Sequence, residues 1–335
     1  MTSKGVGMAV PDWPTSFGYN MFWLPLDKWW GIGGIHDEHL HRLVASTVGA
    51  LVVVLAVWAQ LKEPRRWVRN LAWIGVVMVL IQGLLGGLRV MLDQKEFLAS
   101  TLGVWFGIAH ATLGQVFFST LSLIAFVLSP TWHQFQVATE VRSHLSVDRW
   151  LPWIVGLILV QLMVAATMRH QHAPLAIPDF PLAYGQIWPD TDPATISTIN
   201  ARRIDPMNER DLVALHIHLQ MVHRLIAVAL VTLVMGVSWV LMKQGGLLGR
   251  LGRLWIGLLL IQFCLGAATV WTNKSADVAT AHVAVGAISL MMGILLTVAS
   301  RMRCEVRISK VSPCSRAKDF LKPASPTVAA EGGAR

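Results

Sequence analysis

Seven long apolar runs divide the chain, and short polar segments separate them. The runs cover residues 39–61, 70–92, 103–128, 150–169, 212–242, 254–273 and 277–300. A helix of roughly 20 apolar residues crosses the ~30 Å hydrocarbon core of a bilayer. The pattern therefore predicts an all-α integral membrane protein with seven visible spans. We expect the fifth run to begin as helix outside the bilayer or to run tilted.

Composition supports lipid as the solvent of this chain. Of the 335 residues, 54% are apolar and only 14% are charged, whereas about a quarter are charged in a typical soluble domain. The net charge of +9 would suit nucleic acid, but the basic residues gather in the short segments between apolar runs, as membrane orientation requires. We expect contact with the lipid bilayer and none with nucleic acid.

The basic residues also predict the orientation of the spans. The segments 62–69, 129–149 and 243–253 and the tail 301–335 carry more lysine and arginine than the segments 1–38, 93–102, 170–211 and 274–276. The positive-inside rule places the more basic set in the cytoplasm. We therefore expect a bacterial inner (plasma) membrane protein with its visible N-terminus outside. The C-terminus is then cytoplasmic, and the polar tail is expected to be disordered.

The chain repeats itself. Residues 35–45, Ile-His-Asp-Glu-His-Leu-His-Arg-Leu-Val-Ala, align with residues 217–227, Ile-His-Leu-Gln-Met-Val-His-Arg-Leu-Ile-Ala. Upstream, Val-Pro-Asp-Trp-Pro at 10–14 aligns with Ile-Pro-Asp-Phe-Pro at 177–181, and downstream Ala-His at 109–110 aligns with Ala-His at 281–282. Three shared blocks in the same order predict two pseudo-repeated transmembrane helical bundles. The N-terminal half-bundle covers 1–128, a cytoplasmic linker covers 129–149, and the C-terminal half-bundle covers 150–300.

The repeat also predicts a span that the chain does not show. In the second half, the span at 150–169 precedes the Pro-Asp-Phe-Pro block, whereas the first-half block begins ten residues after Met1. A full duplication has eight spans, so we expect eight, with the first one missing. Either the chain starts at an internal methionine or this form has lost the helix.

Four histidines recur in the repeat inside the spans: His41, His110, His223 and His282. An ionisable residue at membrane depth is costly and marks a candidate functional site. Each falls in the outer half of its span, so the four should lie at similar depth. A haem clamped by one histidine from each of two helices requires that arrangement, and neutral imidazole binds iron well. We expect two iron-binding pairs, His41 with His110 and His223 with His282. The alternatives are interhelical hydrogen bonding and zinc, although zinc prefers four clustered ligands.

Residues beside these histidines extend the candidate sites. Arg42 and Arg224 directly follow their histidines and could reach the propionates of a haem, or anchor the helix at the interface. Glu38 lies one helical turn before His41, whereas its repeat partner Gln220 cannot titrate. The asymmetry suggests that one site performs chemistry and the other transfers electrons. The alternative is that Glu38 only favours the helix N-terminus.

Other polar positions have lesser predicted roles. We interpret one set of histidines as polar neighbours near the surface, namely His36, His39, His216 and His218. A second set is interpreted as solvated loop residues, namely His133, His144, His170 and His172. The glutamines at similar places in three spans are expected to pack helices and to make interhelical hydrogen bonds, namely Gln82, Gln161 and Gln262.

The order of these motifs resembles the haem A synthase family. The resemblance rests on the block at 7–14, on Glu38-His39-Leu40-His41-Arg42, and on His110, His223-Arg224 and His282, and it runs from Met1 to about residue 300. Members of that family are eight-helix membrane enzymes that oxidise the C8 methyl group of haem O to a formyl group. Their product, haem A, supplies cytochrome c oxidase.

The resemblance implies roles for the candidate residues. His41 and His110 would frame the haem O substrate, and Glu38 corresponds to the family's essential carboxylate, a proton acceptor. His223 and His282 would ligate the iron of a haem b cofactor. A haem O synthase and an electron acceptor in the membrane are the implied partners. Many bacterial relatives carry cysteine pairs in the outer loops, but segments 1–38 and 170–211 contain none.

Two other functions explain part of the sequence. A non-enzymatic dihaem b membrane cytochrome that transfers electrons would need the histidine pairs, but not the difference between Glu38 and Gln220. A transporter would explain the repeat, but it predicts interrupted helices and a polar site at the midplane. The polar residues of this chain lie near the outer face instead.

Overall fold

The computed structural model describes residues 9–29, 34–93, 102–130, 132, 147–171, 173–202 and 211–311. Within these ranges, seven helices are long and apolar enough to cross a membrane. They are α2 (Ile35–Lys62), α3 (Arg66–Asp93), α5 (Leu102–Leu128), α7 (Leu151–His170), α9 (Ala214–Gln244), α10 (Gly246–Trp271) and α11 (Ala276–Val311). The described residues form isolated β-bridges but no strand. The prediction of an all-α, multi-pass membrane protein is confirmed.

The largest differences between predicted and observed boundaries are at the start of α10 and the end of α11. α10 begins at Gly246 rather than at 254, directly after Gly245 ends α9 with a positive φ of 68°. Arg250 and Arg253, expected in a loop, therefore lie in the first turns of α10, where long side chains can reach the aqueous boundary. α11 continues to Val311, past the predicted end of the last span at residue 300. Most of the predicted linker and residues 312–335 lie outside the described ranges.

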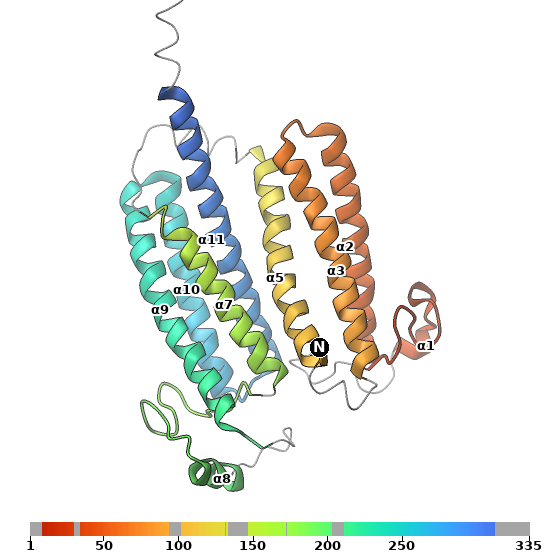
Figure 1. Ribbon diagram of the computed structural model, residues 1–335, viewed down its shortest axis with the longest axis vertical. Coiled ribbons are helices and arrows are strands. Elements are labelled where there is room, and N and C mark those ends of the chain that lie inside the picture. Colours follow the sequence, from red (N-terminus) through yellow and green to blue (C-terminus); the bar gives the residue numbers. More distant parts are fainter. Residues whose placement is uncertain are drawn as a thin grey trace, which may run out of the picture.

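The seven helices form two bundles that stand side by side (Figure 1). In the second bundle, α7 and α10 each pack against both α9 and α11, which closes a ring of four helices. In the first bundle, α3 packs against both α2 and α5. α7 therefore has no counterpart among the described residues of the first bundle. α5 also packs against α7 and α11, and so joins the two bundles.

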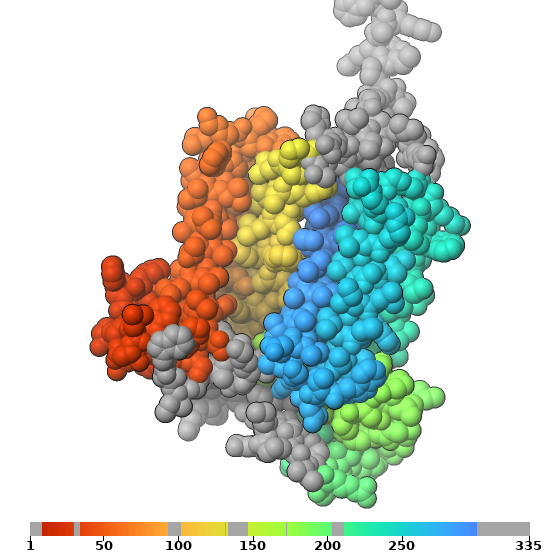
Figure 2. All heavy atoms as spheres, turned by 180° about the vertical axis from the view of Figure 1, so that it is seen from behind, coloured from red at the N-terminus to blue at the C-terminus, as the bar shows by residue number. Residues whose placement is uncertain are grey.

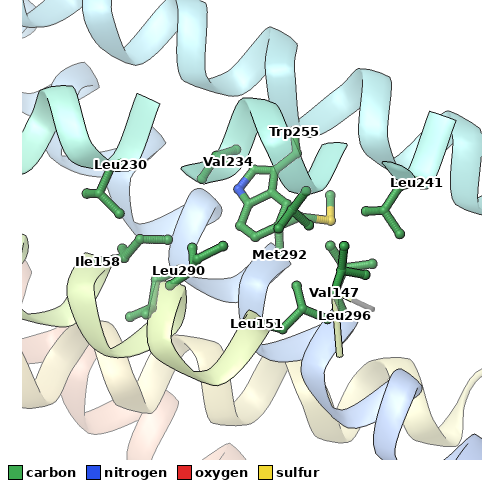
Figure 3. Close-up of a cluster of buried hydrophobic side chains, with 12 residues drawn as sticks. Val147, Leu151, Ile158, Leu230, Val234, Leu241, Trp255, Leu290, Met292 and Leu296 are labelled. Carbon is green, nitrogen blue, oxygen red and sulfur yellow. The ribbon is translucent and has the colours of Figure 1, made fainter. Parts of the chain in front are cut away.

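A continuous apolar core holds the second bundle together (Figure 3). Trp255 of α10 is only 1% exposed and lies among side chains of α7, α9 and α11. Gly293 of α11 makes room for it, since a Cβ there would stand 3.4 Å from Cζ2 of Trp255 and 2.9 Å from Cγ2 of Val155. Close packing of this kind drives helix association in lipid, because apolar side chains gain little hydrophobic free energy when they move from lipid into a helix interface.

Two loop segments, 9–29 and 173–202, lie at the same end of the bundles, which we call the loop end (Figure 2). They include the short helices η2 (Met21–Trp23), α1 (Leu26–Trp29) and α8 (Pro193–Arg202). In each loop an aspartate accepts hydrogen bonds from two successive backbone N–H groups, namely Asp12 from Phe17 and Gly18, and Asp179 from Tyr184 and Gly185. The sequence repeat is therefore also a repeat of loop structure.

Candidate functional site

The four repeated histidines form two facing pairs at corresponding places in the bundles. The ring centres of His41 on α2 and His110 on α5, the first site, are 6.4 Å apart. Those of His223 on α9 and His282 on α11, the second site, are 6.5 Å apart. In each bundle, both histidine helices pack against one middle helix, α3 or α10. The structure thus brings together the pairs that the repeat predicted.

A glycine on each middle helix lets one histidine ring lie close to the backbone. A Cβ at Gly86 would stand 3.3 Å from Cε1 of His110, and a Cβ at Gly266 would stand 3.1 Å from Cε1 of His282. A methyl group at either position would press on the ring. Gly86 and Gly266 therefore help to set the position of one ring in each pair.

Two glutamines contact the histidines in different ways. Nδ1 of His110 lies 3.2 Å from the backbone carbonyl oxygen of Gln82. A carbonyl only accepts, so Nδ1 is the protonated nitrogen and Nε2 keeps its lone pair. In the second bundle, the Gln161 amide donates to the His223 carbonyl at 2.9 Å and lies 3.3 Å from Nε2 of that ring. These contacts confirm Gln161 as an interhelical hydrogen-bonding residue.

The two sites differ in how far other helices cover them. His41 is exposed, whereas His223 is half-buried. α9 packs against both α7 and α10, and α7 places Gln161 beside His223. Within the described residues, α2 packs mainly against α3. The cover of the second site therefore comes from α7.

The spacing of each pair suits a metal held between two imidazoles. Metal–nitrogen bonds of about 2 Å to each ring place the ring centres roughly 6 Å apart. Nδ1 of His223 and Nδ1 of His282 are buried without a hydrogen-bond partner. No group of three or more His, Cys, Asp or Glu side chains in the described ranges could hold a metal ion. A haem carries four in-plane nitrogens and needs only two axial ligands, so each pair fits a haem.

Glu38 and Arg42 form a buried ion pair that ties the first loop to α2. Glu38 is 3% exposed and accepts hydrogen bonds from Nη2 of Arg42 at 2.9 Å and from the backbone N–H of Val10 at 3.2 Å. Arg42 also donates to the carbonyl oxygens of three loop residues, at 3.1 Å, 2.6 Å and 2.8 Å, namely Val10, Asp12 and Thr15. Arg42 is thus the loop's main attachment.

Gln220 and Arg224 hold the second loop without a charge pair. Gln220 accepts a hydrogen bond from the N–H of Ile177 at 2.7 Å and donates to the carbonyl of the same residue at 3.2 Å. Arg224 donates to the carbonyls of Asp179 at 2.7 Å and Leu182 at 2.8 Å. A neutral amide therefore suffices to hold a loop of this shape. Contact of Arg42 or Arg224 with haem propionates stays a prediction.

Two histidines that sequence reasoning placed at the surface or in solvated loops are buried. His39 is 0% exposed and packs edge-on against Trp29, with ring centres 4.7 Å apart. His170 ends α7 and is 8% exposed, and a Cβ at Gly107 of α5 would stand 2.7 Å from its Cε1. The sequence signal for this contact was Gly107, one helical turn before His110, which leaves room on α5 for the His170 ring. His133, His144 and His172 lie outside the described ranges.

Comparison with known proteins identifies related chains. A family model described as COX15-CtaA, cytochrome oxidase assembly protein, matches residues 34–294. A protein of Alkalihalophilus pseudofirmus named heme A synthase is 33% identical over 158 residues, which cover 45% of this chain and 48% of that protein. One of the same name from Shouchella clausii is 32% identical over 193 residues, covering 57% and 59%. A third, from Listeria monocytogenes, is 24% identical over 254 residues, covering 73% and 72%. The chain thus spans about half the length of the first two relatives.

Proposed function

This chain belongs to the COX15-CtaA family of cytochrome oxidase assembly proteins, and from that premise we propose that it is a haem A synthase. Its reaction would be the oxidation of the C8 methyl group of haem O to a formyl group. One observation carries the proposal: two matching histidine pairs stand in the two bundles, and only the first has a carboxylate, Glu38, one turn away. Relatives named heme A synthase support it.

The two sites would have different tasks. His41 and His110 would hold the iron of the haem O substrate, and His223 and His282 would hold that of a resident haem b. The carbonyl of Gln82 would keep Nε2 of His110 free for iron by accepting the hydrogen bond of Nδ1. Haem bound at the second site would supply a redox-active iron that takes up electrons.

Glu38 would be the proton acceptor of the first site. Conversion of a methyl into a formyl group, with water as the oxygen source, releases protons and electrons. Glu38 can take up a proton, whereas Gln220 at the matching place cannot. Because Gln220 holds its own loop as an amide, attachment of the loop does not by itself call for an acid at residue 38. The carboxyl group of Glu38 therefore supports a role in proton uptake during the reaction.

The membrane setting follows from the distribution of charge. Arg65 and Arg66 lie at the α2–α3 turn, and Arg250 and Arg253 lie in the first turns of α10, at the end of the bundles opposite to the loop end. The positive-inside rule would place that end and the C-terminus in the cytoplasm of a bacterial inner membrane. Both sites would then lie near the outer face. A haem O synthase in the same membrane is the proposed source of substrate.

The test exchanges Glu38 for its own repeat counterpart. Glu38→Gln should fold and bind haem, because an amide holds the second loop, but should lose conversion of haem O. The measurement is extraction of haems from membranes of cells that also produce haem O. Gln220→Glu is the matched control and should retain conversion, since Arg224 stands four residues on, as Arg42 does from Glu38. Full conversion by Glu38→Gln would sink the proposal.

A non-enzymatic dihaem b cytochrome is the second candidate. The near-identical separations of 6.4 Å and 6.5 Å in the two pairs favour it, because equal sites suit equal tasks. It predicts that wild-type membranes containing haem O yield no haem A. The purified protein would then carry two haem b groups.

A further inference from the structure

A cavity opens between the ends of α2 and α5, at the end of the first bundle opposite to the loop end (Figure 1). Its volume is about 230 Å³. The lining is apolar except at the end of α2, and consists of Leu55, Trp58, Ala59, Lys62, Glu63 and Leu128. Sites for drug-sized ligands measure about 300–1,000 Å³, so this cavity suits part of a flexible apolar chain better than a bulky ligand.

The matching place in the second bundle is filled by α7. In the repeat, Leu55 of α2 corresponds to Val237 of α9, which is 5% exposed. Ala59 corresponds to Leu241, which is 1% exposed. Val237 and Leu241 lie in one apolar cluster with Leu151 of α7. The described part of the first bundle has no counterpart of α7, and it carries the smaller alanine at this place. The cavity is therefore the space that a helix occupies in the second bundle.

Two differences between α2 and α9 favour an anionic, chain-bearing occupant. Trp58 stands where α9 has Val240, and Lys62 stands where α9 has Gln244. Trp58 is 66% exposed, whereas Val240 packs against the apolar cluster of the second bundle. Tryptophan is enriched where apolar chains meet headgroups, and basic pockets between transmembrane helices bind the headgroups of anionic lipids. The uncovered helix thus carries an aromatic ring and a positive charge where the covered one carries valine and a neutral amide.

Of the two charged residues that line the cavity, only Lys62 lacks an ionic partner among the residues that the structure describes. The Glu63 carboxylate accepts a hydrogen bond from Nη2 of Arg65 at 2.9 Å, and Arg69 donates to the Glu63 carbonyl at 3.2 Å. Arg65 also lies 3.4 Å from the carbonyl oxygen of Val127, which ties the α2–α3 turn to the end of α5. The charge that the cavity offers to a ligand is therefore the positive charge of Lys62.

We propose that this cavity binds one anionic phospholipid, with an acyl chain against Trp58 and Leu128 and the headgroup phosphate at Lys62. The lipid occupies the place that α7 takes in the second bundle and completes the packing between α2 and α5. Under the proposed orientation it belongs to the cytoplasmic leaflet. Lys62 lies 21 residues after His41 on the same helix, a rise of roughly 30 Å. The lipid site is therefore separate from the haem chemistry and does not depend on the proposed function.

The test counts lipids on the purified protein by native mass spectrometry. The full chain in detergent is titrated with dioleoylphosphatidylglycerol and, separately, with dioleoylphosphatidylcholine, whose headgroup has no net charge. Wild type should bind one molecule of the glycerol lipid more tightly than any further one, and more tightly than the choline lipid. Lys62→Gln should lower affinity for the glycerol lipid by roughly fivefold and leave affinity for the choline lipid unchanged. Inorganic phosphate should not displace the lipid, because it has no chain for the apolar lining.

Ala59→Leu tests the cavity itself. It introduces the residue that the second bundle has at this position, and the larger side chain should fill the space and remove the tight binding of both lipids. Val57→Leu is the control, because Val57 is an exposed residue of α2 that does not line the cavity. Val57→Leu should keep the single tightly bound lipid.

Lys243→Gln is the matched control for the charge. Lys243 follows Trp239 by four residues on α9, as Lys62 follows Trp58 on α2, and its Nζ lies 5.3 Å from the Trp239 ring centre. This lysine does not line the cavity, so Lys243→Gln should keep the preference for the glycerol lipid. A loss of preference as large as in Lys62→Gln would contradict the placement of the headgroup.

Three further results would overturn the inference. The first is unchanged lipid binding in both Lys62→Gln and Ala59→Leu, and the second is equal affinity of wild type for the two lipids. The third is a membrane-spanning polypeptide that copurifies while no lipid binds tightly, because a helix then fills the space. Lys62 is exposed, so Lys62→Gln should fold, and the unfolding temperature of each variant checks this. Production of haem A decides only the proposed function, and lipid binding decides only this inference.

Discussion

The carboxylate of Glu38 and the guanidinium of Arg42 lie 2.9 Å apart, buried four residues from each other on α2. Both also bind the backbone of the first loop, at Val10. The proposed proton acceptor therefore also belongs to the ion pair and hydrogen bonds that hold the loop over the site. Its chemical role and its structural role are separable, because Gln220 performs only the structural one in the second bundle.

Removal of Arg42 should destabilise the protein more than removal of the Glu38 charge. Arg42→Gln loses the attachment to three loop carbonyls and leaves a buried carboxylate unpaired, which costs about 3–5 kcal/mol when a buried pair is broken. The double variant Glu38→Gln, Arg42→Gln should recover part of that loss, since no charge is left buried. Thermal unfolding of the four proteins of this cycle in detergent measures it. A loss in the double variant equal to the sum of the two single losses would show that the pair is not coupled.

Alanine at Gly86 should weaken haem binding at the first site alone. The added methyl would press on Cε1 of His110 at 3.3 Å, and such overpacking typically costs about 1–3 kcal/mol. Gly266→Ala should do the same at the second site, through His282. Gly83→Ala on α3 is the control, because nothing lies within 4 Å of its Cβ position. Haem stoichiometry by absorbance reads out each site, and a loss with Gly83→Ala as large as with Gly86→Ala would contradict the argument.

Alanine at Gly107 should loosen the contact between the bundles. A Cβ there would overlap the His170 ring at 2.7 Å, so α7 must shift away from α5. We expect a lower unfolding temperature, and restoration by adding His170→Ala, which removes the overlapping ring. Gly103→Ala, in the same helix, meets nothing within 4 Å and should be neutral. If His170→Ala does not restore the unfolding temperature, the loss of stability does not come from the contact between Gly107 and His170.

The turn between α2 and α3 should lose stability in acid. Hydrogen bonds from the Arg65 side chain lower the pKa of Glu63 from 4.5 to about 2, against the opposing effect of burial. A carboxyl group whose pKa is lower in the folded than in the unfolded state stabilises the fold at pH values above its unfolded pKa. This stabilisation is lost as the pH falls from 4.5 toward 2. Solvent screening keeps the effect modest. The unfolding temperatures of wild type and Glu63→Gln should therefore differ at pH 7 and converge near pH 2; a constant difference across that range would refute the assignment.

Much of the fold could be predicted from sequence because its signals are local. A span is recognisable from about 20 apolar residues wherever it packs, so all seven were found. The histidine pairs followed from an internal alignment, which compares the chain with itself and needs no coordinates. The contrast of Glu38 with Gln220 came from the same alignment. Helix ends were less secure, as α10 and α11 show, because arginine is a good helix former and charge alone does not end a helix.

Tertiary structure decided the features that depend on contacts between particular helices. The sequence by itself determined the spans, the repeat, the four histidines and the unmatched Glu38. Only the packing of α7 on α5 buried His170, and only the folded loop brought Val10 to Glu38 and Arg42. The physical reason is that apolar spacing specifies a helix, whereas lipid-facing and helix-facing positions carry similar side chains in a membrane. The choice between them lies in close contacts such as Gly86 with His110 and Gly107 with His170, which form only when helices far apart in sequence meet.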